Sequence, residues 1–154
     1  MWLLAGCGAT CGRHSPVVER LVDPPLVVVA GGIDVRRTTE YDGAVYYSVD
    51  DPFPASVLQE RLGEALARAG WTPSQETLFS IVAQSKPGEW EEYQERDGTR
   101  VTQLFRAWKN ADNDLVTFIL RYRSPPNESR RHTAMVTGVL TKASTVERLR
   151  RKSK

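Results

Sequence analysis

The sequence predicts an α+β fold: an antiparallel β-sheet, a meander of about five to six strands, with one amphipathic helix packed on one face. Several segments alternate apolar and polar residues between turn sequences, one segment has helical periodicity, and the expected order of elements is β-β-α-β-β-β-β. Strands joined by short turns pair antiparallel, and a lone amphipathic helix buries its apolar side against such a sheet. A chain of 154 residues is long enough for one core of this kind.

The first hairpin is expected over residues 33–51. Two stretches rich in Val, Thr and Tyr flank Asp42-Gly43, a pair that readily takes the positive φ values of a tight hairpin turn. On the second arm, Val45, Tyr47 and Val49 point to the same side of the strand. One face of this hairpin is therefore expected to meet a core.

The segment 55–69 predicts the amphipathic helix. Its apolar residues recur at spacings of three and four positions and mark one face: Leu58, Leu62, Ala65, Leu66 and Ala69. We expect Gly70 to end the helix in a left-handed conformation, with Trp71 folding back as the hydrophobic contact that accompanies such a cap.

The second half of the chain predicts strands. A second hairpin is expected from Trp90 to Lys109, followed by a strand around 116–122 with clean alternation and a last strand around 133–141. The apolar run 78–82 fits a helix or a strand, and the pattern does not decide between them. Glu91 and Glu95 share one face of their strand with Tyr93, and we interpret them as a solvated sheet edge.

These elements predict a single α+β domain at residues 33–142. Residues 8–32 are expected to be a tether or linker, in which 26–30 forms a short strand or lies against the body. Residues 143–154 form a basic C-terminal tail. The last eight residues carry five basic side chains and one acidic one, although the net charge of the whole chain is only +2. We expect this tail to be solvated and poorly ordered. The alternative is attraction to anionic phospholipid or another polyanion.

The N-terminal residues match a processing motif. Leu4, Ala5, Gly6 and Cys7 fit, position by position, the pattern of an aliphatic residue, two small residues and a cysteine. This stretch resembles the lipobox of bacterial lipoproteins, with residues 1–7 as a partial signal. The resemblance implies lipidation of Cys7 with acyl chains such as palmitate, and a lipid anchor to a bacterial membrane on the periplasmic or outer-surface side of the cell envelope.

Only six residues precede Cys7, and none of them is Lys or Arg. A secretory signal has a basic start and an apolar stretch of roughly 7–15 residues, so we expect the true start to lie upstream of Met1. A competing interpretation pairs Cys7 with Cys11 in a disulfide or a metal site, although a metal would need further ligands, for which only His14 is near in sequence.

A second, looser resemblance covers residues 46–71. An Asp-Pro-aromatic-Pro sequence, one amphipathic helix and a closing Gly-Trp are similar to small bacterial envelope proteins of unknown function. This resemblance implies an envelope protein and carries over no catalytic residue.

Arginine and aromatic side chains interleave on the predicted strands. Such a sheet surface can hold single-stranded nucleic acid or sugars, so we expect a binding face at these positions: Arg106, Trp108, Arg121, Tyr122 and Arg123. The alternative is that these residues are half core and half solvated surface.

No residue pattern predicts catalysis, a cofactor or a small-molecule substrate. Asn110, Asp112 and Asp114 resemble the start of a calcium loop, but its glycine and closing glutamate are missing, and a turn between strands explains them better. The sequence therefore predicts a membrane-anchored envelope lipoprotein with a non-catalytic binding or scaffolding domain and an envelope protein as its partner. The alternative is a soluble binding module that uses the Arg and aromatic sheet face, with nucleic acid as a less favoured ligand.

Overall fold

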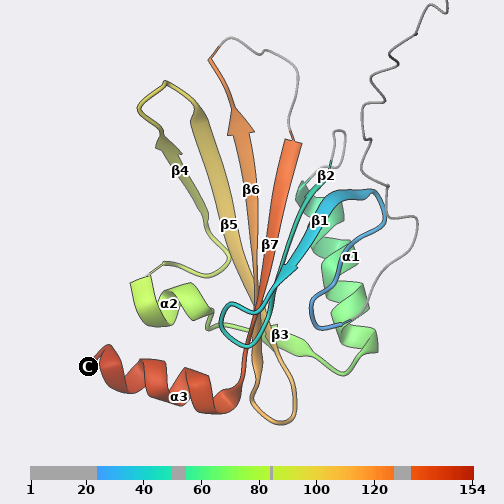
Figure 1. The fold of residues 1–154 in the computed structure, drawn as a ribbon, viewed down its shortest axis with the longest axis vertical. Coiled ribbons are helices and arrows are strands. Elements are labelled where there is room, and N and C mark those ends of the chain that lie inside the picture. Colours follow the sequence, from blue (N-terminus) through green and yellow to red (C-terminus); the bar gives the residue numbers. More distant parts are fainter. Residues whose placement is uncertain (1–23, 50–54, 84, 127–132) are drawn as a thin grey trace, which may run out of the picture.

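The structure, a computed structural model, describes residues 24–49, 55–83, 85–126 and 133–154. Its described part contains one antiparallel sheet of seven strands and three helices, which confirms the α+β class (Figure 1). The strands are β1 (Gly32–Thr38), β2 (Ala44–Val49), β3 (Thr72–Ser74), β4 (Trp90–Gln94), β5 (Arg100–Lys109), β6 (Leu115–Ser124) and β7 (Thr133–Thr141). The helices are α1 (Ala55–Arg68), α2 (Leu78–Ala83) and α3 (Ala143–Lys152).

The sheet departs from a simple meander at two places. Strands β4, β5, β6 and β7 follow one another as neighbours, but the N-terminal hairpin then joins the free side of β7, giving the order β1-β2-β7-β6-β5-β3. On the other edge, β3 and β4 lie end to end along β5, where Thr72 pairs with Lys109 and Trp90 pairs with Leu104. Pairing between β2 and β7 joins segments far apart in sequence, which local patterns do not report.

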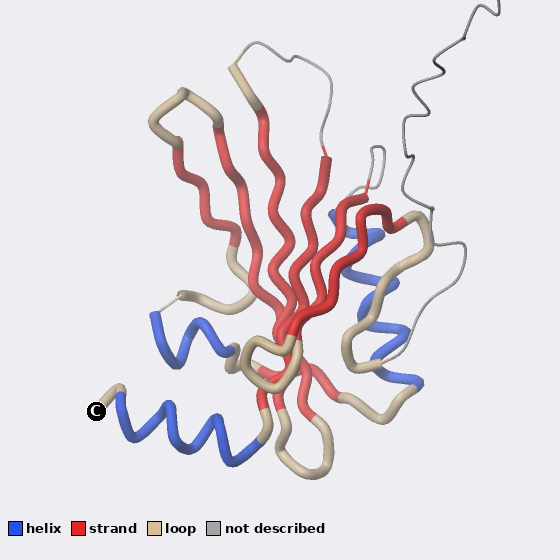
Figure 2. Tube along the Cα trace, viewed as in Figure 1, coloured by secondary structure: helices blue, strands red, loops and turns tan. Residues whose placement is uncertain are grey.

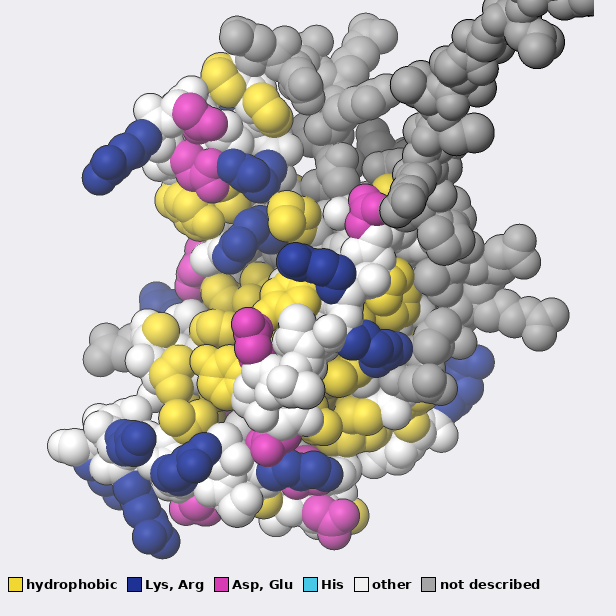
Figure 3. Space-filling view, viewed as in Figure 1, with side chains coloured by type: hydrophobic (Ala, Val, Ile, Leu, Met, Phe, Trp, Pro, Cys, Tyr) yellow, Lys and Arg dark blue, Asp and Glu magenta, His cyan; other side chains and the backbone are white. Residues whose placement is uncertain are grey.

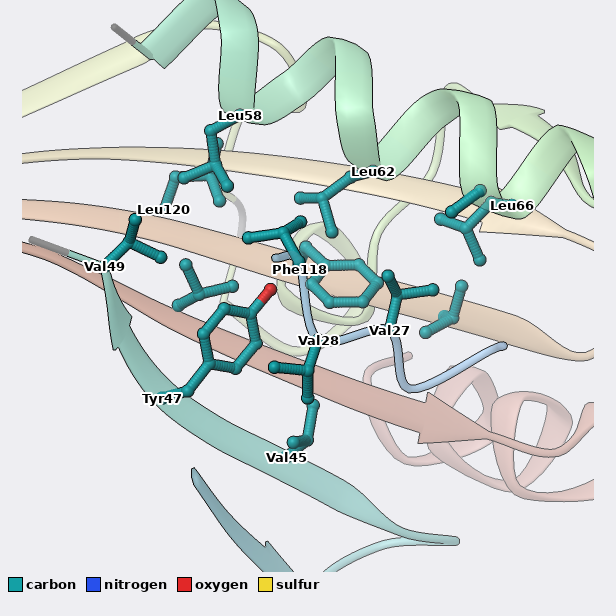
Figure 4. Packing of buried hydrophobic residues seen from close by; sticks show 14 of the residues in the cluster. Val27, Val28, Val45, Tyr47, Val49, Leu58, Leu62, Leu66, Phe118 and Leu120 are labelled. Atoms are coloured by element: carbon teal, nitrogen blue, oxygen red, sulfur yellow. The ribbon is translucent and has the colours of Figure 1, made fainter. Parts of the chain in front are cut away.

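The main core lies between α1 and one face of the sheet. Four of the five residues of the predicted helix face are buried: Leu58, Leu62 and Leu66 fully, against the strands (Figure 4), and Ala65 beside them. The fifth, Ala69, follows the end of α1 and is exposed. The predicted inward residues of β2 also meet this core, and Tyr47 reaches it with its hydroxyl group, whose pKa is raised by burial. Phe118 of β6 packs beside them. Burial of such side chains is the main term that stabilises the fold.

The end of α1 is the predicted glycine cap. Gly70 has a φ of 83°, and the backbone amide of Trp71 donates to the carbonyl of Leu66 at 2.9 Å. The amide of Gly70 donates to Ala67 at 3.0 Å, so the two bonds form a Schellman motif. Trp71 is buried in the main core, as the hydrophobic contact of such a cap requires.

The segment before β1 belongs to the folded body. Val27, Val28 and Val29 are all at most 1% exposed and lie in the main core, although the segment forms no strand beyond an isolated bridge (Figure 4). Of the two alternatives for residues 26–30, the packed segment is the one observed. The described body therefore begins before residue 33, because three consecutive valines are too apolar to remain in solvent. Residues 8–23 of the expected tether lie outside the described residues.

The C-terminal segment differs from the expected disordered tail. Residues 143–152 form α3, which packs beside α2 on the sheet face opposite α1 (Figure 1). Val146 is buried against Ala107 and Leu115, and Leu149 packs against Leu78. The two apolar residues are three positions apart on an otherwise polar helix, a signal weak enough to be hidden by the surrounding charge.

The apolar run 78–82, which fits a helix or a strand by its sequence pattern, forms helix α2. The hydroxyl of Thr77 accepts the backbone amide hydrogen of Ser80, and the hydroxyl of Ser80 accepts that of Thr77, both at 2.9 Å. This reciprocal pair is a capping box built with serine in place of glutamate. The amide of Leu78 donates to the Thr117 hydroxyl of β6 at 3.0 Å, which fixes the short helix to the sheet.

In the part of the chain that the structure describes, no helix is long and apolar enough to cross a membrane.

Candidate binding face

The described helices cover only half of the sheet face opposite α1. Helices α2 and α3 lie over the end of this face that contains Ala107 and Leu115, and no described helix lies over its other end (Figure 2). We call the uncovered part the open face. By strand alternation and register, it carries Tyr46, Tyr93, Gln103, Arg121, Met135 and Thr137.

The open face exposes two large side chains with apolar surface. Met135 of β7 is 43% exposed and Tyr93 of the edge strand β4 is 42% exposed, and the strands between them carry Arg121 and Gln103 on this face. Figure 3 looks onto this side of the molecule and shows hydrophobic side chains over the strands with Lys and Arg side chains among them. An exposed apolar area rimmed by charge is typical of a surface that contacts another molecule.

A shallow groove crosses the open face beside β1. Its volume is about 490 Å³, and Val35, Tyr46 and Met135 are among the residues that line it. A bulge in β1 shapes one wall: the register with β2 shifts between Ile33 and Arg36, and Asp34 has a φ of 55°. Bulges of this kind turn side chains out of the regular alternation, and Val35 is accordingly exposed at the groove.

Polar contacts fix the groove's aromatic side chain. The hydroxyl of Tyr46 donates to the carboxylate of Glu40, and the guanidinium of Arg36 lies 5.5 Å from the centre of the Tyr46 ring. The hydrogen bond to Glu40, together with partial burial, raises the pKa of Tyr46. The Glu40 and Arg36 contacts hold the Tyr46 ring in one position at the groove.

The arginines of the open face are held by neighbouring strands. Arg121 donates to Gln103 Oε1 through Nε at 3.3 Å and Nη2 at 3.1 Å, and Gln103 donates to Glu91 at 3.0 Å. This chain of contacts runs across β6, β5 and β4. Arg123 forms an ion pair with Glu95 in the same region. The predicted placement of Glu91 and Tyr93 on one strand face is confirmed by their register.

The five residues expected to form a binding face do not share one surface. Arg121 and Arg123 lie on the open face, whereas Arg106, Trp108 and Tyr122 lie on the face that α1 covers. The reason is the period of two in a strand, which sends adjacent residues to opposite sides.

The residues on the α1 side have structural contacts. Trp108 is 6% exposed and packs edge-on against Phe118, with 6.0 Å between ring centres. Arg106 Nε donates to Gln59 of α1 at 3.2 Å. Tyr122 packs on Trp90 at the edge of the core, with 5.9 Å between ring centres, and burial raises its pKa.

Sequence reasoning missed the groove. Met135 is adjacent to Val136, which faces the core, so strand alternation is the one signal that could have placed Met135 on the opposite face. Two features bring Val35 and Met135 to the same groove: the bulge in β1 and the pairing of β2 with β7. Neither feature is indicated by the residue pattern of a single segment.

A larger hollow of about 640 Å³ lies between β3 and α3. Its main charged groups satisfy one another, because Arg150 binds the carboxylates of Glu76 and Glu147. This arrangement ties α3 to the loop before α2, and we interpret it as structural.

The expected alternative of a calcium loop is also explained by local structure. Asn110 Oδ1 accepts the backbone amide hydrogens of Asp112 and Asp114 at 3.0 and 2.9 Å, as in an ordinary turn. No group of three or more His, Cys, Asp and Glu side chains in the described residues is arranged to hold a metal ion. Cys7, the expected lipidation site, lies outside the described residues, as do residues 50–54 of the looser envelope-protein resemblance.

A comparison of the chain with known protein families, with curated proteins and with solved structures found no match.

Proposed function

We propose that this chain is an envelope lipoprotein, anchored to a bacterial membrane through Cys7, whose domain binds or scaffolds an envelope protein without catalysis. The observation that carries the anchor is the match of Leu4, Ala5, Gly6 and Cys7 to a lipobox. Residues 8–23 separate Cys7 from the described body, a length that spans at most about 55 Å when extended. Such a reach would leave the domain near the membrane while its surface stays accessible.

The open face supports the binding part of the proposal. It joins an apolar groove to charged side chains that are already held in place, and a preorganised surface loses less entropy when a partner binds. A protein partner fits this chemistry because protein interfaces combine an apolar centre with a polar rim.

Nucleic acid is less well supported as the ligand. The described cations on the open face already have contacts: Arg36 lies over the Tyr46 ring, Arg121 contacts Gln103, and Arg123 pairs with Glu95. The nearby carboxylates would also repel a phosphate backbone. Binding of nucleic acid that falls steeply with salt would favour this alternative over the protein partner.

The anchor is tested by expressing the full genomic reading frame, including any codons upstream of Met1, in a bacterial host. We expect an intact mass increased by a diacylglycerol and acyl group, and recovery in the detergent phase. Cys7→Ser should abolish both, whereas Cys11→Ser, a matched loss of one thiol four positions away, should leave both unchanged. An unmodified protein in all three forms would contradict the anchor.

The binding face is tested by placing a photo-crosslinking amino acid at Met135 in the anchored protein. We expect defined adducts with an envelope protein at this position. The same probe at Ala67, exposed on α1 on the other side of the sheet, should give none of them. The proposal for the open face would be abandoned if both positions gave the same adducts or if neither gave any.

A further inference from the structure

The exposed side of α3 carries a cluster of basic side chains without acidic partners. Among the described ion pairs, Arg150 is the α3 cation that is neutralised, by Glu76 and Glu147. The other basic side chains of this segment are exposed and take part in no described ion pair: Arg148, Arg151, Lys152 and Lys154. Figure 3 shows Lys and Arg side chains gathered over the corner of the molecule that α3 occupies.

These charges sit on a fixed element. Val146 is 5% exposed against the sheet, and Leu149 packs against the α2 side. The backbone amide of Ala143 is held by Asp114, and Arg150 ties the helix to Glu76. The direction in which the basic side chains point is therefore set by the fold, unlike that of a solvated tail.

An apolar side chain borders the basic cluster. Ile81 of α2, which is partly exposed, lines a hollow of about 370 Å³ between α2 and α3 together with Arg151 and Lys154. Glu76 and Glu147 line the same hollow, and both bind Arg150. Helix α2 lies beside α3 (Figure 1), and Ile81 and the basic side chains line the hollow between them.

We propose that this corner is a docking surface for anionic phospholipid headgroups. We call it the basic corner and define it as Arg148, Arg151, Lys152 and Lys154 with Ile81. Basic side chains are attracted to the negative surface of a membrane that contains anionic lipid, and an adjacent apolar group can enter the boundary between headgroups and acyl chains.

The apolar border favours a lipid surface over nucleic acid, which offers phosphates without an apolar layer beneath them. This inference rests on the proposed function, because the lipid on Cys7 would hold the basic corner close to a membrane. It adds a second contact that orients the domain on the bilayer.

The expected contribution of each charge can be stated as a change in affinity. A basic residue near an anionic membrane contributes about 1 kcal/mol, or about fivefold in partitioning. Removing three of them should therefore weaken binding on the order of a hundredfold. The attraction should also fall as salt is added, because exposed charges are screened.

The test uses the full 154-residue chain with Cys7→Ser, so that no acyl group contributes to binding. Its partitioning is measured by co-sedimentation with vesicles of equimolar phosphatidylglycerol and phosphatidylcholine, and with vesicles of phosphatidylcholine alone. The first variant, called the α3 variant, adds Arg148→Gln, Arg151→Gln and Lys152→Gln. Glutamine has a helix propensity similar to that of Arg and Lys but carries no charge.

The matched control removes the same number of charges elsewhere, through Arg37→Gln, Arg96→Gln and Lys109→Gln. These three side chains are exposed and take part in no described ion pair. Thermal unfolding of both variants confirms that each is folded, so a loss of binding cannot be a loss of structure.

We expect binding to the anionic vesicles that is absent with phosphatidylcholine alone, lost in the α3 variant and retained in the control variant. The proposal is overturned by no binding to anionic vesicles, by equal weakening in both variants, or by binding to duplex DNA in the absence of vesicle binding. Failure here leaves the mass increment on Cys7 unaffected, so the two proposals fail separately.

Discussion

The carboxylate of Asp114 accepts the backbone amide hydrogen of Ala143 at 3.0 Å, so the turn between β5 and β6 caps the first turn of α3. The residue at the N-cap position, Lys142, makes no such side-chain bond, but its ammonium group binds Asp114 at 3.2 Å. Asp42, in the turn between β1 and β2, accepts the backbone amide hydrogen of Lys142 at 2.7 Å. Two distant turns thus supply the acceptors that a helix start normally finds in its own sequence.

Replacing Asp114 with Ala should lower the free energy of unfolding by about 1–2 kcal/mol, because the α3 amide and the Asn110 side chain lose a shared acceptor. Urea unfolding at neutral pH measures the change. Asp112→Ala is the matched control, since this exposed carboxylate lies in the same turn and only its backbone amide is bonded there. Equal losses in the two variants would show that the turn, and not the cap, is responsible.

The stabilisation by Asp114 should depend on pH. Burial alone would raise the pKa of this carboxyl, but the hydrogen bonds from Ala143, Asn110 and Lys142 outweigh it and lower the pKa below 3.8. A carboxylate with a lowered pKa in the folded state stabilises the fold above its unfolded pKa, and this stabilisation is lost as the pH falls through the folded value.

The difference in unfolding free energy between the parent and Asp114→Asn should therefore be constant near neutrality and shrink below about pH 4. Urea titrations over a pH series measure it. A difference that stayed constant into the acid range would assign the stabilisation to a hydrogen bond that does not need the charge.

Gly138 cannot accept a side chain without displacing the core. A Cβ at this position would lie 2.7 Å from Phe118 Cε1 and 3.0 Å from Val45 Cγ1. Gly138→Ala should destabilise the protein by about 1–3 kcal/mol, the usual cost of overpacking. Gly63, inside α1, has open space apart from an ordinary 3.9 Å contact with Trp108, so Gly63→Ala should stabilise by about 0.5–1 kcal/mol. Differential scanning calorimetry on both variants should show opposite shifts of Tm.

Val28 should behave as a core residue although it precedes the first strand. Val28→Ala removes two methyl groups from a side chain that is 1% exposed, and we expect a loss of about 2 kcal/mol in unfolding free energy. Val35→Ala makes the same change at the exposed position of the β1 bulge and should cost less than about 0.5 kcal/mol. If Val28→Ala were as mild as its control, residues before β1 would be a linker after all.

The features that could be predicted from the sequence are those whose cause is local. Asp42-Gly43 marked a hairpin turn, which is observed, although the positive φ values fall at Tyr41 and Gly43, 52° and 129°, and not at Asp42. Gly70 and Trp71 marked a helix end because the cap is made within six residues. The periodicity of α1 placed Leu58 and Leu62 in the core correctly, since one helical face had to be buried.

What could not be predicted depends on neighbours that are remote in sequence. Helix α3 is ordered by Asp114 and by a sheet face that its own residues do not reveal, so charge alone indicated a tail. The residues of the expected binding face divide between the two sides of the sheet, because Tyr122 lies between Arg121 and Arg123 and a strand sends it to the opposite side. The groove was missed because two features form it together. One is the bulge in β1, and the other is the pairing of β7 with β2.

The pairing of β2 with β7 has a consequence for the order of assembly. The paired residues are 85 to 95 positions apart, from Val49 with Ala134 to Ala44 with Val139. While the chain is being synthesised, the N-terminal hairpin therefore has an unfilled edge and an apolar side until β7 has emerged. The strand that covers this early edge is the last of the described strands, so the sheet cannot close in the order in which its strands are made.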